Sequence, residues 1–314
     1  MKIKKIHILG FIIILFGIYS FSKVYFTSIH FKIPKGFPQP IYNFKSNPLS
    51  EEGFELGRKL FYDPILSKDS TISCASCHLQ QTGFTHVDHD LSHGIDGKIG
   101  TRNSLTIQNI AWNKNFMWDG GINHLDVQAL APITSEIEMN ETMQNVVKKL
   151  NRNKKYQESF KKTFGTSTIT GQLTLKAISQ FVVLLISSNS KYDKVLRNEE
   201  KFNIMEQKGY DLFKKNCASC HKEPLLNSNE FKNNGLPLDY TLNDFGRMNI
   251  TRAAKDSLKF KVPTLRNIEF TYPYMHDGRF KTLNEVIKHY NHGIQTSKTL
   301  SKELIKPKNL SDNE

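Results

Sequence analysis

The pentapeptide CASCH at residues 74–78 recurs unchanged at residues 217–221. Each copy is a Cys-x-x-Cys-His motif, in which two thiols attach to one haem and the histidine that follows coordinates its iron. The motif residues are Cys74, Cys77, His78, Cys217, Cys220 and His221. The chain has four cysteines, and the two motifs use all of them. The sequence therefore predicts two covalently bound haem c groups and leaves no thiol for a disulfide.

Two other uses of paired cysteines fit this chain poorly. A redox-active Cys-x-x-Cys pair needs no trailing histidine and would not recur with the same Ala-Ser interior. Zinc knuckles built from two such pairs usually lie within a few tens of residues of each other. Here 217 − 74 = 143 residues separate the pairs, so haem attachment is the favoured interpretation.

The length of 314 residues suffices for two domains, and each half contains one motif. The formal net charge is +13, but the lysines are scattered and form no arginine-rich or lysine–aromatic patch. A solvated basic surface explains this charge, and we expect no nucleic-acid partner.

The N-terminus has the pattern of an export signal. Lys2, Lys4 and Lys5 precede an apolar run at residues 6–21, which gives a basic region followed by a hydrophobic one. The run is short for a transmembrane helix of about 20 residues. A cleaved signal peptide and an uncleaved membrane anchor both remain open for residues 1–26. Export to the periplasm suits haem attachment, which in bacteria takes place outside the cytoplasmic membrane.

The remaining sequence predicts a mainly α fold with two cytochrome c-like haem domains, at residues 27–195 and 196–314. Apolar residues recur at helical spacing within 171–188. Helices are also expected from residue 50 to about 61, at 141–163 and at 203–216. A terminal Ser311–Glu314 resembles a capping box that opens a helix, so either the chain continues in the natural protein or these residues form a frayed tail.

Similar segments recur in the same order in both halves. Gly57–Phe61 precedes the first motif, and Gly209–Phe213 precedes the second. Arg102-Asn103 is later followed by Trp118-Asp119-Gly120, and Arg266-Asn267 is later followed by His276-Asp277-Gly278. This order predicts duplication of one haem-binding unit.

Several short motifs together give the chain a specific resemblance. They are Ser92-His93-Gly94, Arg102-Asn103, Met117–Gly120, Glu136–Met139, Pro263–Asn267, Pro273–Gly278 and Tyr290–Gly293. With the two pentapeptides, they span about residues 53–293. Over this region the chain resembles the bacterial di-haem cytochrome c peroxidase family, which includes the MauG-type enzymes.

The resemblance implies roles for residues around the first haem, which would be the peroxidatic one. His93, 93 − 78 = 15 residues after His78, matches a detachable sixth ligand of the iron on a glycine-rich loop. Glu138 matches the carboxylate that moves protons, and Gln128 matches its hydrogen-bonding neighbour. Trp118 matches a tryptophan between the two haems.

Other histidines and a cation site complete the expectations for this half. His86 and His89 also follow the first motif, and we expect both at the surface. The resemblance further implies a calcium ion bound by Asn103, Thr271 and the carbonyl of Pro273, since hard oxygen ligands suit calcium.

The sixth ligand of the second haem is less certain from sequence. Where peroxidases of this family have methionine, this chain has Tyr290, as MauG-type enzymes do. Met275, Met248, His289 and His292 are rival ligands. His93, by contrast, is a feature of the peroxidases, so the chain combines features of both groups.

The expected function is that of a periplasmic di-haem cytochrome c peroxidase. Electrons from a small donor, such as a cytochrome c or a cupredoxin, would enter at the second haem, pass Trp118 and reduce hydrogen peroxide at the first. Two alternatives remain open: a MauG-like enzyme that oxidises a protein partner, and a di-haem electron carrier without catalysis. By analogy with the family, a homodimer is also expected.

Overall fold

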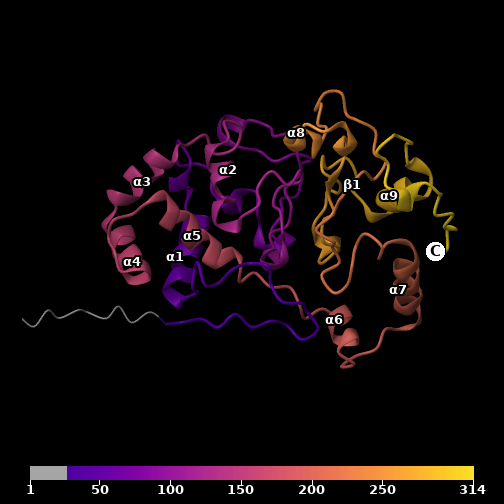
Figure 1. Cartoon of the computed structure of the whole chain (residues 1–314), viewed down its shortest axis with the longest axis horizontal. Helices are drawn as coiled ribbons and strands as arrows, with labels where there is room; N and C mark the ends of the chain where they lie inside the picture. The colour runs from indigo at the N-terminus through magenta and orange to yellow at the C-terminus, as the bar shows by residue number, and fades with distance from the viewer. Residues whose placement is uncertain (1–26) are drawn as a thin grey trace, which may run out of the picture.

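Figure 1 shows the computed structural model, which describes residues 27–314 as a mainly helical chain. The helices are α1 (Glu51–Tyr62), α2 (Leu130–Thr134), α3 (Met143–Asn151), α4 (Lys154–Phe164), α5 (Gly171–Val182), α6 (Lys191–Leu196), α7 (Ile204–Asn216), α8 (Met248–Thr251) and α9 (Leu283–Lys288), and the strands are β1 (Phe231–Lys232) and β2 (Phe260–Lys261). Helices α1–α5 gather on one side of the molecule, and α7–α9 with β1 lie on the other. The mainly α prediction is confirmed.

Two predictions about organisation are not decided by this arrangement. The expected export segment, residues 1–26, lies outside the described residues. The division at 195/196 falls at the end of α6, in the connection between the two sides, and stays a prediction. Within residues 27–314, no helix combines the length and the apolar character needed to cross a bilayer.

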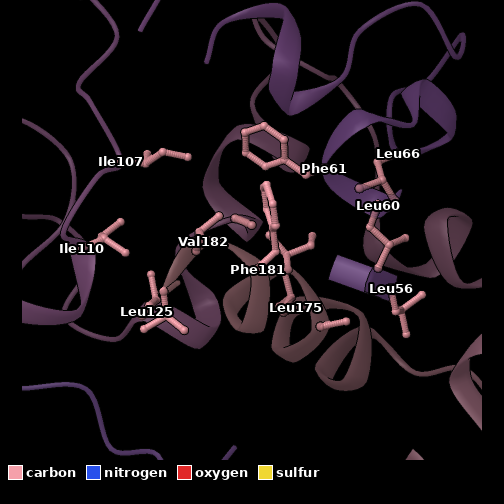
Figure 2. Close-up of a cluster of buried hydrophobic side chains, with 14 of the residues drawn as sticks. Leu56, Leu60, Phe61, Leu66, Ile107, Ile110, Leu125, Leu175, Phe181 and Val182 are labelled. Atoms are coloured by element: carbon pink, nitrogen blue, oxygen red, sulfur yellow. The ribbon is translucent and has the colours of Figure 1, made fainter. Parts of the chain in front are cut away.

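The main hydrophobic core lies where α1 packs against α5 (Figure 2). Leu56, Leu60 and Phe61 of α1 face Phe181 and Val182 of α5, and all are buried. The apolar positions follow the 3.6-residue helical period, which places them on one face of each helix. The core therefore forms a rigid base beside the first haem motif.

Glycines allow this close crossing of α1 and α5. A Cβ on Gly57 would lie 2.0 Å from the carbonyl oxygen of Ala177, and one on Gly53 would lie 1.9 Å from Oε1 of Gln180. Neither distance is compatible with a larger side chain in the present packing. The glycine of the repeated Gly57–Phe61 segment is thus required by packing.

The structure divides the helix expected at 141–163 into α3 and α4. The break occurs at Asn153, whose side chain accepts hydrogen bonds from the backbone N–H groups of Lys155 and Tyr156. An asparagine that caps a new helix competes with continuation of the preceding one. Helix α5 likewise ends at Val182 rather than at residue 188.

The internal repeat is present in the backbone, with one correction to its register. Asn109 and Asn267 both adopt left-handed backbone conformations, with φ of 55° and 58°, and each precedes a 3₁₀ turn. They lie nine residues before Trp118 and His276 respectively (118 − 109 = 9; 276 − 267 = 9). The counterpart of Arg266-Asn267 is therefore residues 108–109, and the prediction of Arg102-Asn103 was wrong.

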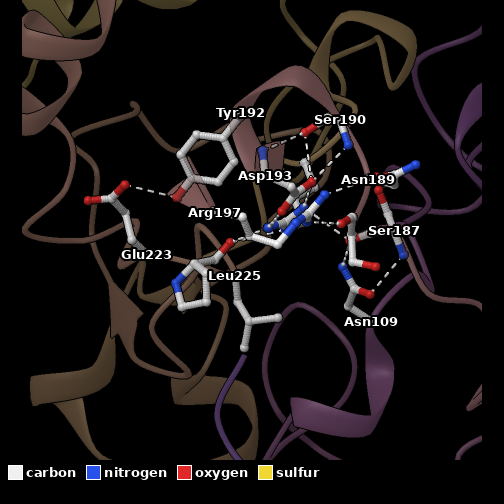
Figure 3. A network of polar contacts seen from close by, with 12 residues as sticks. Asn109, Ser187, Asn189, Ser190, Tyr192, Asp193, Arg197, Glu223 and Leu225 are labelled. Atoms are coloured by element: carbon white, nitrogen blue, oxygen red, sulfur yellow. Dashed lines mark hydrogen bonds and ion pairs between the residues drawn. The ribbon is translucent and has the colours of Figure 1, made fainter. Parts of the chain in front are cut away.

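A buried polar network joins the two sides of the molecule at α6 (Figure 3). The guanidinium of Arg266 lies 2.7 Å from the carboxylate of Asp193, and each side chain is 3% exposed. Arg266 also donates to the carbonyl oxygen of Ser187 at 3.0 Å, while the side chain of Asn109 donates to the same oxygen at 2.9 Å. The network thereby ties the repeat of one side to the repeat of the other.

Candidate functional site

The first motif folds into a tight turn that presents its histidine. The N–H of His78 donates to the carbonyl oxygen of Cys74 at 3.0 Å, and its ring Nδ1 lies 2.8 Å from the carbonyl oxygen of Phe84. Because a carbonyl only accepts, Nδ1 must carry the proton, which leaves Nε2 free for a metal. Burial lowers the pKa of His78 and so favours the neutral imidazole that metal binding requires.

The second motif repeats this arrangement. Nδ1 of His221 lies 3.2 Å from the carbonyl oxygen of Leu226 and 3.1 Å from that of Pro263. The hydroxyls of Thr106 and Thr264 each donate, at 2.6 Å, to a carbonyl that follows the respective motif. Both histidines are therefore oriented in the same way, each with Nδ1 at a backbone carbonyl and Nε2 left free for a metal.

Two adjoining cavities open beside the first motif. One has a volume of about 310 Å³ and reaches Trp118 and the other half of the molecule, whereas the second has a volume of about 60 Å³ and reaches His93. Cys77 and His78 line both. All four cysteines are free of disulfides. Free thiols, a correctly oriented histidine and an adjoining cavity together fit a covalently attached haem.

The loop that carries His93 approaches Glu138 closely. A Cβ on Gly94 would lie 2.0 Å from the carbonyl oxygen of Ile137 and 2.6 Å from Cα of Glu138. The N–H of Ile95 donates to the carbonyl oxygen of Glu138 at 2.7 Å. Gly94 is therefore required for contact between the two segments, which brings His93 and Glu138 to the wall of the same cavity.

The structure contradicts one expectation about the neighbouring histidines. His86 is fully buried rather than at the surface, and its Nδ1 lies 3.0 Å from the hydroxyl of Ser104. His89 is half-buried. The rings of His86, His89 and His93 form a stack in which successive centroids are 4.2 Å apart. The hydrogen bond with Ser104 and the contact with the ring of His89 hold His86 in its buried position.

Glu138 and Gln128 both line the two cavities beside His78. Burial raises the pKa of Glu138, although a hydrogen bond with Ser135 partly opposes this shift. Nε2 of Gln128 lies 3.8 Å from Sδ of Met117. The site thus combines a carboxyl of raised proton affinity with a neutral hydrogen-bond donor.

Trp118 lies where the two halves meet, with 8% of its surface exposed. Its Nε1 donates to the carbonyl oxygen of Asn103 at 2.8 Å, and its ring meets that of His276 edge-on, with centroids 6.5 Å apart. The single polar atom of the indole therefore has a hydrogen-bond partner, and the ring is held in the wall of the larger cavity.

The predicted calcium ligands are brought together only in part. Nδ2 of Asn103 donates to the carbonyl oxygen of Pro273 at 2.6 Å, whereas Oδ1 of Asn103 is buried without a hydrogen-bond partner. The hydroxyl of Thr271 instead lies 3.4 Å from the carbonyl oxygen of Ile268. The unpaired oxygen suits a cation, but calcium binding stays a prediction.

Tyr290 and Met275 both approach one residue, Asn234. The Asn234 side chain hydrogen-bonds that of Tyr290, and its Nδ2 lies 3.3 Å from Sδ of Met275. Burial raises the pKa of Tyr290 to about 12, with smaller contributions from the thiols of Cys220 and Cys217. Tyr290 therefore lies near the second motif, in a short π-helical turn at His289–Gly293.

The other rival ligands have different surroundings. Nε2 of His289 lies 3.0 Å from the carbonyl oxygen of Asn234, and Nε2 of His292 lies 3.0 Å from Nδ2 of Asn291. Met248 lies on α8. Both histidines use Nε2 in hydrogen bonds, and Tyr290 and Met275 likewise bond to Asn234, so Tyr290 as the sixth ligand, with these rivals, stays a prediction.

The sequence analysis assigned no role to the charges of two basic residues that line the larger cavity, Arg102 and Lys261. Arg102 lies 2.6 Å from both Asp119 and Asp244, the latter in the other half. Lys261 also lines this cavity and is only 6% exposed. The available signal was the position of Lys261 in the apolar run Phe260-Lys261-Val262-Pro263, since a lysine between core residues is rarely buried without a reason.

Comparison with known proteins agrees with these features. Residues 51–201 match the family model of the di-haem cytochrome c peroxidases. The chain is 36% identical to the cytochrome c551 peroxidase of Nitrosomonas europaea, with 85% of this chain and 81% of that protein covered. It is 33% identical to the methylamine utilization protein MauG of Methylorubrum extorquens, over 90% of this chain and 80% of that protein.

A solved structure adds agreement in three dimensions. The crystal structure of a MauG-like protein associated with microbial copper homeostasis superimposes with a TM-score of 0.84 at 32% identity, covering 91% of this chain and 92% of the other. The chain belongs to the di-haem cytochrome c peroxidase family. Its relatives include both cytochrome c peroxidases and MauG proteins.

Proposed function

We propose that this protein is an exported di-haem peroxidase. It would convert one hydrogen peroxide, two electrons and two protons into two waters, with haem c attached at residues 74–78 and 217–221. The observation that carries the proposal is the cavity beside the first motif, where His78, His93, Gln128 and Glu138 meet. A carboxylate that can transfer protons, an amide donor and a histidine oriented for a metal on one cavity support peroxide reduction at that site.

Each of these side chains has a distinct task in the proposal. A haem held by Cys74, Cys77 and His78 would supply the redox-active iron. The carboxylate of Glu138 accepts a proton from one peroxide oxygen and returns it to the other, so that water leaves. Nε2 of Gln128 donates a hydrogen bond to the substrate. His93 serves as the ligand that must move before substrate enters.

Electron supply is assigned to the C-terminal half. A small periplasmic redox protein, such as a cytochrome c or a cupredoxin, would deliver electrons near His221. Trp118 is proposed to carry them onward, because its rigid indole lies at the junction of the halves and lines the cavity that reaches His78. Its hydrogen bond to the carbonyl of Asn103 holds the ring in that position.

The test of the proposal is Glu138→Gln, which keeps the size of the side chain but removes the proton acceptor. We expect steady-state peroxide reduction with reduced cytochrome c to fall by about 10²–10⁴-fold. The matched control is Glu136→Gln, since Glu136 is exposed two residues away and should leave turnover unchanged. Full activity in Glu138→Gln, with both haems spectrally intact, would refute the assigned role.

A second candidate function is MauG-like oxidation of a protein side chain. The observation that favours it is Tyr290, a half-buried tyrosine near the thiols of the second motif, where a methionine ligand would be expected in a peroxidase. A phenolate ligand stabilises ferric iron and would lower the potential of that haem. Under this hypothesis turnover needs no prior reduction, and a protein partner acquires a covalent change.

A further inference from the structure

Lys261 is a buried lysine whose position links the two halves. It lies on β2, and its backbone N–H donates to the carbonyl oxygen of Trp118 at 2.7 Å. Only 6% of the residue is exposed, and both residues of β2 are buried. The strand therefore carries a cation into the junction beside Trp118.

No carboxylate compensates this cation among residues 27–314. Burial is the sole cause acting on the pKa of Lys261, which it lowers to about 8. Arg102, which lines the same cavity, is by contrast a paired cation, because Asp119 and Asp244 each lie 2.6 Å from its guanidinium. Burying an ammonium without an anion costs free energy. An anionic ligand beside Lys261 would remove this cost.

The surroundings of Lys261 identify the class of that ligand. It lines the cavity of about 310 Å³ together with Cys77, His78 and Asn103. Two carboxylates line the cavity. Asp119 is already paired with Arg102, and Glu138 makes no contribution to the pKa of Lys261. The missing negative charge must therefore come from the group that occupies the cavity, and each haem carries two carboxylates as its propionates.

We propose that the ammonium of Lys261 pairs with a propionate carboxylate of the haem held by Cys74, Cys77 and His78. The C-terminal half would thus supply a counter-charge to the haem anchored in the N-terminal half. This inference rests on the proposed attachment of that haem. A nearby cation favours the reduced iron, which carries one positive charge fewer, so Lys261 raises the reduction potential at the end of the path through Trp118.

The test compares Lys261→Met, Lys261→Gln and Lys261→Arg in the full-length holoprotein. Spectroelectrochemical titration gives the midpoint potentials of both haems, and resonance Raman spectra report the propionate bending bands. We expect Lys261→Met and Lys261→Gln to lower one midpoint potential and to shift the propionate bands. Lys261→Arg should keep both near the wild-type values, because the positive charge remains.

Lys259→Met is the matched control. The Lys259 side chain is 27% exposed and pairs with Asp256 at 3.3 Å. The substitution therefore removes a charge near Lys261 but outside the cavity, and the midpoint potentials and propionate bands should stay unchanged. Unaltered potentials and bands in Lys261→Gln would overturn the ion pair. Haem content is measured separately by pyridine haemochrome: two haems per chain with unaltered bands refute only this inference, whereas fewer than two refute the proposed attachment itself.

Discussion

At the scale of single residues, the site depends on backbone groups that orient the side chains of the two motif histidines and of His93. The carbonyl oxygens of Phe84 and Leu226 set the tautomers of His78 and His221. Gly94 positions His93 because it has no Cβ, which lets the His93 loop contact the backbone at Glu138.

The expected effect of Gly94→Ala follows from that contact. The new methyl would lie 2.0 Å from a backbone oxygen that cannot rotate away, so we expect a loss of roughly 1–3 kcal/mol in unfolding free energy. His93 should be displaced, which changes the ratio of low-spin to high-spin ferric signal in electron paramagnetic resonance.

Thermal unfolding measures the change in stability, and electron paramagnetic resonance spectra of the ferric protein measure the displacement of His93. Gly209→Ala on α7 is the control, since nothing lies within 4 Å of the added methyl and alanine favours a helix. Equal stability and identical spectra for Gly94→Ala and wild type would contradict the contact.

At the scale of elements, α6 is held by its buried ion pair rather than by apolar packing. Asp193 is a buried position of this six-residue helix. Its partner Arg266 follows the second motif by 45 residues (266 − 221 = 45), and its guanidinium also lies 4.8 Å from the ring of Phe37. One arginine thus connects three segments that are distant in sequence.

Asp193→Asn should destabilise the protein by about 3–5 kcal/mol, because it leaves the Arg266 charge buried and unpaired. Burial alone would raise the pKa of Asp193, but hydrogen bonds from Arg266 and Ser190 hold it below its ordinary value. The folded state therefore binds fewer protons than the unfolded state. The stabilisation is fully present above the unfolded pKa of about 3.9 and is lost as the pH falls through the lower folded pKa.

Urea unfolding at several pH values measures this prediction. In Asp193→Asn the loss of stability between neutral and acidic pH should be smaller than in wild type. Glu199→Gln is the control in the same region, because Glu199 pairs with Arg197 at the surface, with 49% of its side chain exposed, and such pairs stabilise little. Equal pH profiles for Asp193→Asn and wild type would exclude the proposed linkage.

At the scale of the whole molecule, the two halves are joined at the loop that carries His93. Asp90 of this loop forms an ion pair with Lys281, and a Cβ on Gly278 would lie 2.2 Å from the carbonyl oxygen of Asp90. Arg102 and Asn103 add bonds to Asp244 and to the carbonyl of His276. A rearrangement in the C-terminal half therefore has direct contacts through which to reach His93.

We expect prior reduction to the mixed-valence state to increase steady-state peroxide reduction, because His93 must move before substrate enters. The measurement is turnover with reduced cytochrome c before and after pre-reduction, with spectra recorded alongside. Equal turnover in both states would favour the Tyr290-based, MauG-like hypothesis. No turnover in either state, with both haems intact, would favour an electron carrier.

Features of this protein that depend on local chemistry are predictable from its sequence. Two Cys-x-x-Cys-His motifs predict haem attachment because the thiols and the ligand are adjacent in the chain, and helical periodicity predicts α1, α5 and α7. The family motifs also located Glu138, Gln128 and Trp118, which all line the cavities beside His78.

Features that depend on contacts between distant segments become visible only in the folded chain. The inward burial of His86 and the convergence of Tyr290 and Met275 on Asn234 have no local signal in the sequence. Lys261 shows the reason most clearly. Its sequence neighbours are apolar, but whether its charge is matched depends on side chains and ligands that folding brings to it from elsewhere in the chain.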